Sequence, residues 1–217
     1  MPRHPREDNS DWRLLFAATS RPSERAARGP DILLDLQQPT SMTTPRQKPN
    51  ILITGTPGTG KTTMVQALTS QLPSLRAVDI GKLVEDKQLH TGWDEEYQSY
   101  VLDEDRLLDE LEDEMQPGGV IVEYHGADLF PERWYDLVLV LRADTSVLYT
   151  RLESRGYTEK KLSDNVEAEI MQVILDEARE AYREEIVIEM PSNSIEDIES
   201  CVARTAAWMQ AWKPAQG

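Results

Sequence analysis

A glycine-rich run directly after a short apolar segment is the feature that most constrains this chain. Residues 55–63 read Gly-Thr-Pro-Gly-Thr-Gly-Lys-Thr-Thr, which fits the spacing G-x-x-x-x-G-K-[ST], and residues 51–53 before them are apolar. Glycines at such positions let the backbone curl, so that successive N–H groups point at phosphate oxygens. The pattern predicts a strand, a phosphate-binding loop and a helix, and it indicates a nucleoside triphosphate as ligand. A chance glycine-rich turn is the alternative.

Each polar position of this loop has an expected task. A helix beginning at Gly60 and Lys61 would direct the positive end of its dipole at the phosphates. Lys61 can reach the β- and γ-phosphates, and the Thr62 hydroxyl can ligate Mg²⁺. The loop therefore predicts a site for ATP-like ligands together with a magnesium ion.

From Asn50 onward, predicted strands alternate with predicted helices. We expect strands at 51–54, 77–80, 120–124, 137–141 and 186–190, and helices at 61–71, 103–115, 146–154, 164–183 and 195–212. Two of the strands, 120–124 and 137–141, are nearly continuous apolar runs, which is typical of parallel strands covered on both faces. The order predicts a three-layer α/β domain with about five parallel strands.

An acid and a histidine stand at the end of the predicted strand 120–124. Glu123 lies where many NTPases place the carboxylate that holds Mg²⁺, usually through water. His125 comes two residues later and could orient water or contact the γ-phosphate, although a structural histidine is the alternative. We therefore treat Glu123 as a candidate metal-holding residue and His125 as a candidate catalytic residue.

Arg151 and Arg155 lie one helical turn apart, just before Gly156 and a short charged loop. Two guanidinium groups on one helix face suit a phosphoryl group in transfer, because planar forks can bridge donor and acceptor oxygens. Ordinary i, i+4 pairing at an exposed helix end is the alternative. Because a charged loop follows, the pattern favours a lid.

Charge is distributed unevenly in this chain of net charge −16. Residues 1–48 hold 8 Lys/Arg against 6 Asp/Glu, whereas residues 49–217 hold 15 against 33. A domain as acidic as this is expected to repel nucleic acid and attract basic proteins. The alternative is that the charge only keeps the surface solvated.

The single cysteine, Cys201, excludes a disulfide framework within the chain. No apolar stretch is long enough to cross a membrane.

Residues 1–48 also differ from the rest in being rich in Arg, Pro and Ser. Such a composition predicts a disordered extension before the domain at 49–217. Met42 stands shortly before the first predicted strand, where a compact version of the protein could start. We therefore expect residues 1–41 to be dispensable.

An ordered set of motifs resembles the adenylate kinase isoenzyme 6 family over about residues 49–213. The motifs are residues 49–63 around the phosphate loop, Asp-Glu-Glu-Tyr at 94–97, Leu-Asp-Glu-Asp-Arg at 102–106, Gly-Gly-Val-Ile-Val at 118–122, Tyr-His-Gly at 124–126, Phe-Pro-Glu-Arg-Trp at 130–134, Arg-Leu-Glu-Ser-Arg-Gly-Tyr at 151–157 and Pro-Ser-Asn at 191–193. That family comprises nuclear adenylate kinases and ATPases of eukaryotes, linked to maturation of the small ribosomal subunit.

The resemblance implies a P-loop nucleoside-monophosphate kinase fold, with a monophosphate-binding region over about 79–102 and a lid over about 154–164. It implies the reaction ATP + AMP ⇌ 2 ADP with Mg²⁺, accompanied by slow ATP hydrolysis. Arg155 would close over the ATP phosphates, His125 matches the family's strand-end histidine, and the loop 191–194 would cradle adenine. The residues that would hold ATP are Gly58, Gly60, Lys61, Thr62 and Thr63.

The resemblance further implies a basic small-subunit ribosomal protein as partner, and the nucleus and cytoplasm as locations. The chain departs from the family at Glu123, where aspartate is usual, so its carboxylate sits one methylene further out. Among other classes, a GTPase would need an N-K-x-D motif, which the sequence lacks. An ATP-gated assembly factor with vestigial kinase activity needs the same ATP site, so residue types leave that alternative open.

Overall fold

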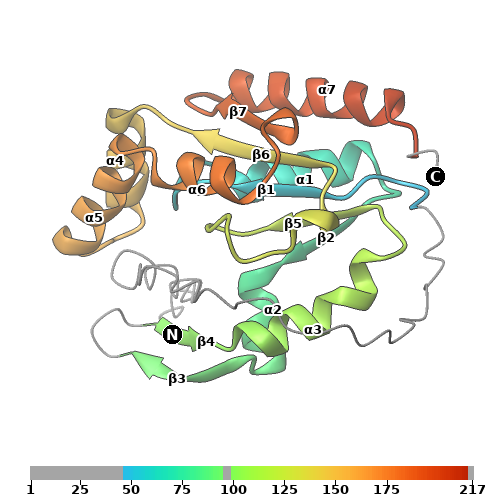
Figure 1. Ribbon diagram of the computed structural model, residues 1–217. Helices are drawn as coiled ribbons and strands as arrows, with labels where there is room; N and C mark the ends of the chain where they lie inside the picture. The colour runs from blue at the N-terminus through green and yellow to red at the C-terminus, as the bar shows by residue number, and fades with distance from the viewer. Residues whose placement is uncertain (1–45, 95–98, 215–217) are drawn as a thin grey trace, which may run out of the picture.

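Five parallel strands form the central sheet of the computed structural model, which describes residues 46–94 and 99–214 (Figure 1). The strands are β1 (Ile51–Thr54), β2 (Arg76–Asp79), β5 (Val120–Glu123), β6 (Leu137–Arg142) and β7 (Val187–Pro191). Their order is β2-β5-β1-β6-β7, and each neighbouring pair is parallel. The predicted three-layer α/β class with about five parallel strands is therefore confirmed.

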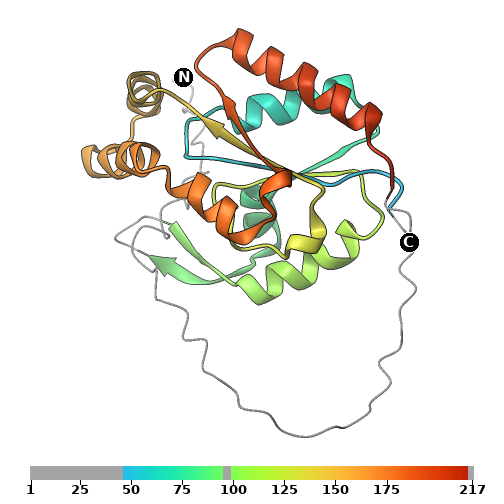
Figure 2. The ribbon, with the colours of Figure 1, turned by 45° about the horizontal axis from the view of Figure 1, so that its top comes forward.

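Helices cover both faces of this sheet (Figures 1 and 2). One face carries α1 (Lys61–Gln71) and α7 (Ile195–Ala211), and the other carries α2 (Ile80–Lys87), α3 (Glu104–Met115) and α6 (Val173–Ala181). Ile51 and Ile53 of β1 pack in the core under α1 and α7, whereas Leu52 packs in the opposite core. Because successive side chains point to opposite faces, a strand covered on both sides is apolar at nearly every position.

The helix α3 shows how local sequence sets these elements. Its buried residues Leu107, Leu111 and Met115 recur every four positions, so they lie on one face of the helix. The Asp103 side chain accepts a hydrogen bond from the backbone N–H of Arg106, which caps the first turn. The remaining face is mostly acidic and turned away from the core.

The segment between β2 and α3 contains more structure than the sequence indicated. It holds α2 and a separate two-stranded hairpin of β3 (His90–Asp94) and β4 (Ser99–Leu102), where we predicted no strand. The ring of Tyr100 stacks on His90 and meets Trp93 edge-on, with centroid distances of 4.1 and 5.0 Å. Aromatic cross-strand contacts of this kind stabilise a short hairpin.

The predicted single helix 164–183 is wrong, because two helices replace it. Helix α5 (Glu159–Ile170) follows α4 (Thr145–Ser154), and α6 starts after Gln172, which adopts a left-handed conformation with φ of 58°. Glu169 and Leu175 are both buried, yet on one straight helix their side chains would point about 120° apart. The break lets Glu169 reach the phosphate loop while Leu175 enters the main core.

The described chain begins at residue 46 in contact with the domain. Arg46 donates from Nη1 to the carbonyl of Trp134 at 2.6 Å and pairs with Asp136. The predictions about residues 1–41 lie outside the described residues. Within residues 46–94 and 99–214, no helix has the length and apolarity needed to cross a bilayer.

Candidate nucleotide-binding site

The phosphate loop joins β1 to α1 and takes the curled form that its glycines predict. Gly55, Gly58 and Gly60 have φ values of 140°, 92° and 91°, a region that side chains rarely allow. A Cβ atom at Gly55 would lie 2.4 Å from the carbonyl oxygen of Leu141 in β6. The loop is therefore packed so closely on the sheet that glycine is required there.

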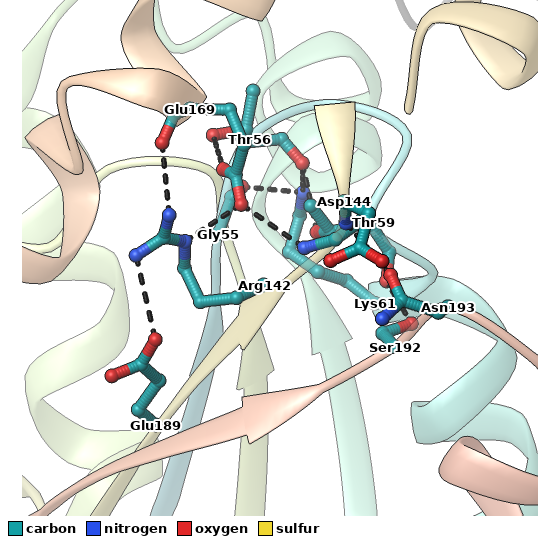
Figure 3. A network of polar contacts seen from close by, with 11 residues as sticks. Gly55, Thr56, Thr59, Lys61, Arg142, Asp144, Glu169, Glu189, Ser192 and Asn193 are labelled. Atoms are coloured by element: carbon teal, nitrogen blue, oxygen red, sulfur yellow. Dashed lines mark hydrogen bonds and ion pairs between the residues drawn. The ribbon is translucent and has the colours of Figure 1, made fainter. Parts of the chain in front are cut away.

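Lys61 is the first residue of α1, and its ammonium group lies inside the curl of the loop. Its Nζ donates to the carbonyl oxygens of Gly55 at 2.7 Å and Thr56 at 3.1 Å, and the residue is buried (Figure 3). A cation held at the N-terminus of a helix adds to the positive dipole end. The arrangement makes an anion-binding concavity suited to phosphate.

Thr62 and Glu123 meet beside this lysine. The Thr62 hydroxyl donates to Oε1 of Glu123 at 2.5 Å, across the gap between α1 and the end of β5. The parallel register pairs Ile53 with Glu123, which brings the two strand ends together. The sequence placed both residues at one metal site, and the structure brings them into contact.

The donor set fits Mg²⁺. A hydroxyl and a carboxylate are the hard oxygen ligands this ion prefers, and Mg²⁺ usually takes only one or two protein ligands besides water and substrate phosphates. No group of three or more His, Cys, Asp or Glu side chains suited to a metal occurs in the part of the chain that the structure describes. A magnesium ion here would thus be held by Thr62 and Glu123 together with ligand oxygens.

His125 follows β5 and is buried at the same edge of the sheet. Its ring lies against that of Tyr124, with centroids 4.3 Å apart. The adjacent Gly126 accepts a hydrogen bond from the Thr54 hydroxyl at 3.1 Å, which fixes the turn after β5 to the end of β1. The structure therefore brings His125, Glu123 and the phosphate loop to one edge, as expected for parallel strand ends.

The two arginines of α4 take different positions. Arg151 donates to the carbonyls of Gly58 at 3.3 Å, Ser192 at 2.8 Å and Asn193 at 3.0 Å, so it braces the phosphate loop against the turn after β7. Partial burial, and then the charge of Arg155, lowers the pKa of Arg151. Arg155 ends α4 with an exposed side chain. Of the pair, Arg151 is held against the phosphate loop, and the expected phosphate contact of Arg155 stays a prediction.

The turn after β7, where the family resemblance would place adenine, is fixed to the phosphate loop and to the end of β6 by side-chain hydrogen bonds. The buried Ser192 hydroxyl donates to the carbonyl of Thr59 at 2.5 Å. The Asn193 side-chain oxygen accepts from the backbone N–H of Asp144 at 2.7 Å. These bonds join β6, β7 and the phosphate loop at one end of the sheet.

A buried carboxylate that sequence reasoning missed lies on the other side of the loop. Glu169, from α5, accepts a hydrogen bond from the Thr56 hydroxyl at 2.5 Å and pairs with Arg142 at 2.6 Å (Figure 3). One glutamate among the 39 acidic residues of this chain carries no distinguishing signal in the sequence. The structure alone shows that it belongs to the site.

Carboxylates also cluster around the segment that follows β5. Burial, and then the charge of Asp128, raises the pKa of Glu177 in α6 to about 7. Burial and Asp128 likewise raise the pKa of Glu104 at the start of α3. The raised pKa of Glu177 brings the titration of this side chain close to neutral pH.

The fold and the phosphate loop are those of a P-loop α/β protein. The chain is similar in structure to shikimate kinase from Bacteroides thetaiotaomicron, with a TM-score of 0.53 and 20% identity, over 74% of this chain and 98% of that one. A similar match, with a TM-score of 0.53 and 15% identity, relates it to shikimate kinase from Acinetobacter baumannii over 76% of this chain and 94% of that one. At such identities the likeness concerns the fold.

Sequence comparison identifies the family. A family model described as an AAA domain matches residues 51–172. The chain is 52% identical over 167 residues to the adenylate kinase isoenzyme 6 homolog of Dictyostelium discoideum, covering 77% of this chain and 95% of the relative. It is 48% identical to the homolog of Schizosaccharomyces pombe, again over 77% and 95%. The protein belongs to the adenylate kinase isoenzyme 6 family, which confirms the resemblance drawn from its motifs.

Proposed function

We propose that this protein is a Mg²⁺-dependent adenylate kinase that catalyses ATP + AMP ⇌ 2 ADP and also hydrolyses ATP slowly. The observation that carries the proposal is the 2.5 Å contact between Thr62 and Glu123 beside the buried Lys61. The Lys61 ammonium group, which can bind phosphate, thus lies next to the Thr62 and Glu123 oxygens, which suit magnesium. The names of the relatives support AMP as the acceptor.

The chain's own residues divide the work of phosphoryl transfer. Lys61 neutralises charge on the β- and γ-phosphates, and the backbone N–H groups of the loop bind their oxygens. Thr62 and Glu123 would hold the magnesium ion, which when bound neutralises phosphate charge. Arg155, exposed at the end of α4, would turn onto the phosphates when the segment 154–164 closes. The acceptor would bind over the region 79–102, which holds α2 and the hairpin.

A coupled assay with ATP and a panel of nucleoside monophosphates tests this function. We expect AMP to be the preferred acceptor, with turnover that depends on Mg²⁺. Lys61→Ala should lower the rate about a thousandfold, because a clamp on the transferring phosphoryl group is lost. Glu199→Ala, an exposed change in α7, is the control. Near-normal turnover in Lys61→Ala would contradict the assignment.

A second role, in maturation of the small ribosomal subunit, is favoured by the acidic face of α3. Ion pairs join Glu110 to Lys87, Glu112 to Arg133 and Glu114 to Arg76. Three exposed acids on the same helix have no ion pair within the described ranges: Asp105, Asp109 and Asp113. Such a surface suits a Lys/Arg-rich chain and repels RNA.

We propose that a basic ribosomal protein binds this face in the nucleus and cytoplasm. We further propose that ATP binding or turnover changes the affinity for that partner. An assembly factor with vestigial kinase activity would bind the partner equally well and transfer little phosphate to AMP. Pull-down with such a protein should weaken with Asp109→Lys combined with Asp113→Lys, and with added salt. Glu199→Lys on the opposite face serves as control. Binding unchanged by charge reversal and by salt would contradict the contact.

A further inference from the structure

Glu169 is a buried carboxylate near the end of α5 that contacts two other segments of the chain. Its Oε2 accepts from the Thr56 hydroxyl at 2.5 Å, and its Oε1 accepts from Nε of Arg142 at 2.6 Å and from the backbone N–H of Ala143 at 3.0 Å. Figure 3 shows it between Thr56 of the phosphate loop and Arg142 at the end of β6. One side chain thus connects α5, the loop and the central sheet.

The surroundings of Glu169 explain why a charge can be buried there. A carboxylate removed from water is costly unless it is paired and hydrogen-bonded. Arg142 supplies the opposite charge, and its Nη2 also donates to the backbone carbonyl of Glu169 at 2.9 Å. The Thr56 hydroxyl donates a hydrogen bond to Oε2, the carboxylate oxygen that Arg142 does not contact. Loss of the Thr56 hydroxyl would therefore leave a buried acceptor without its donor.

Helices α4 and α5, which we call the α4–α5 arm, contact the phosphate loop at a second point. A Cβ atom at Gly58 would lie 2.9 Å from a methyl carbon of Leu148 and 3.0 Å from one of Leu152, both in α4. These leucines form a small buried cluster with Leu162 of α5. The loop therefore rests on the α4–α5 arm through apolar contact at Gly58 and through a hydrogen bond at Thr56. A shift of α5 must move the loop or break the bond between Thr56 and Glu169.

We propose that Glu169 is a positioning residue for ATP: through Thr56 it holds the phosphate-binding loop in the shape that binds a triphosphate. Glu169 lies one residue before the end of α5, so a change in the position of α5 would reach the loop through this contact. The inference rests on the ATP site of the proposed function, and it makes no use of AMP as the acceptor.

Direct binding of Mg²⁺-ATP and of AMP, each measured by calorimetry on the whole chain, tests this proposal. Thr56→Val, which removes the hydroxyl at constant shape, and Glu169→Gln should each raise the Kd for ATP about tenfold. The double variant should raise it by less than the product of the two single effects, because both changes act on the contact between Thr56 and Glu169. The Kd for AMP should stay at the wild-type value, and Thr56→Ser should restore ATP binding.

The matched control is Thr205→Val, which removes another buried hydroxyl that donates a hydrogen bond, to Cys201 in α7, at 2.8 Å. It should leave both Kd values unchanged. Wild-type ATP binding in Thr56→Val would overturn the proposal, and so would equal weakening of ATP and AMP binding. If Glu169→Gln fails to fold, Thr56→Val and Thr56→Ser still decide the matter. Because these are binding constants, failure of the wild type to phosphorylate AMP would contradict only the proposed function.

Discussion

The Thr62 hydroxyl lies 2.5 Å from the carboxylate of Glu123, although the two residues are 61 positions apart in the chain. Parallel pairing of β1 with β5 creates this proximity, because it brings the carboxyl end of β5 beside the start of α1. The pair provides the oxygen ligands that a magnesium nucleotide needs next to Lys61. The predictions that follow depend on this arrangement.

The first prediction concerns the charge of Glu123. Glu123→Gln keeps the size of the side chain and an acceptor for Thr62, but it removes the negative charge that attracts the ion. We expect the Mg²⁺ concentration for half-maximal ATP turnover to rise by about tenfold or more, as is usual when a group supporting a metal is lost. A magnesium titration of the rate measures this, and Glu123→Asp should behave almost like the wild type. An unchanged magnesium requirement in Glu123→Gln would refute the assignment.

The second prediction separates His125 from Glu123. If His125 orients the attacking water or the γ-phosphate, His125→Gly should lower ATP hydrolysis more than Glu123→Asp does, because aspartate still supplies a carboxylate. Phosphate release without AMP measures hydrolysis. Equal, wild-type hydrolysis in both variants would return His125 to a structural role beside Tyr124.

The third prediction compares two glycines with positive φ. Gly55 and Gly156 have φ of 140° and 74°, so alanine is strained at both, by about 1–2 kcal/mol at the left-handed Gly156 and by at least as much at Gly55. A Cβ at Gly55 also meets the Leu141 carbonyl at 2.4 Å, whereas at Gly156 it meets no atom within 4 Å. Gly55→Ala should therefore destabilise the fold by a further 1–3 kcal/mol, roughly. Urea unfolding of both variants checks the difference, and equal losses would argue against the close packing.

The fourth prediction follows from Glu177, whose pKa is raised by burial and by Asp128 from 4.5 to about 7. The folded protein holds this proton more tightly than the unfolded chain does. The contribution of Glu177 to stability is therefore complete below pH 4.5 and is lost as the pH rises to about 7. Glu177→Gln should flatten the pH dependence of the free energy of unfolding in that window and exceed wild-type stability at pH 8.

The control for this pH effect is Glu199→Gln, an exposed change on α7, whose charge is not among those that raise the pKa of Glu177. It should leave the pH profile of stability as it is in the wild type. Chemical unfolding across pH 4 to 8 measures both variants. Lower stability of Glu177→Gln at pH 8 would contradict the assigned cause.

Local spacing allowed the sequence to predict the phosphate loop and its attached strand and helix, because the glycines, Lys61 and Thr62 carry their chemistry in one short segment. The pairing of Thr62 with Glu123 followed from strand ends meeting at one edge of a parallel sheet. The break at Gln172 could not be foreseen, since nothing in that residue's chemistry opposes a helix. Tertiary packing of Glu169 and Leu175 in different directions imposes the break. The hairpin at 90–102 was missed because its strands are short and interrupted by polar residues.

The fate of the γ-phosphate tests the central claim most directly. Wild-type protein would be incubated with Mg²⁺, AMP and ATP labelled at the γ-phosphate, and the products would be separated at early times. A kinase built around Lys61, Thr62 and Glu123 should place most of the label in the β-phosphate of ADP. It should release labelled inorganic phosphate only slowly. Label found in inorganic phosphate alone, at a rate unaffected by AMP, would contradict the account and leave an ATPase.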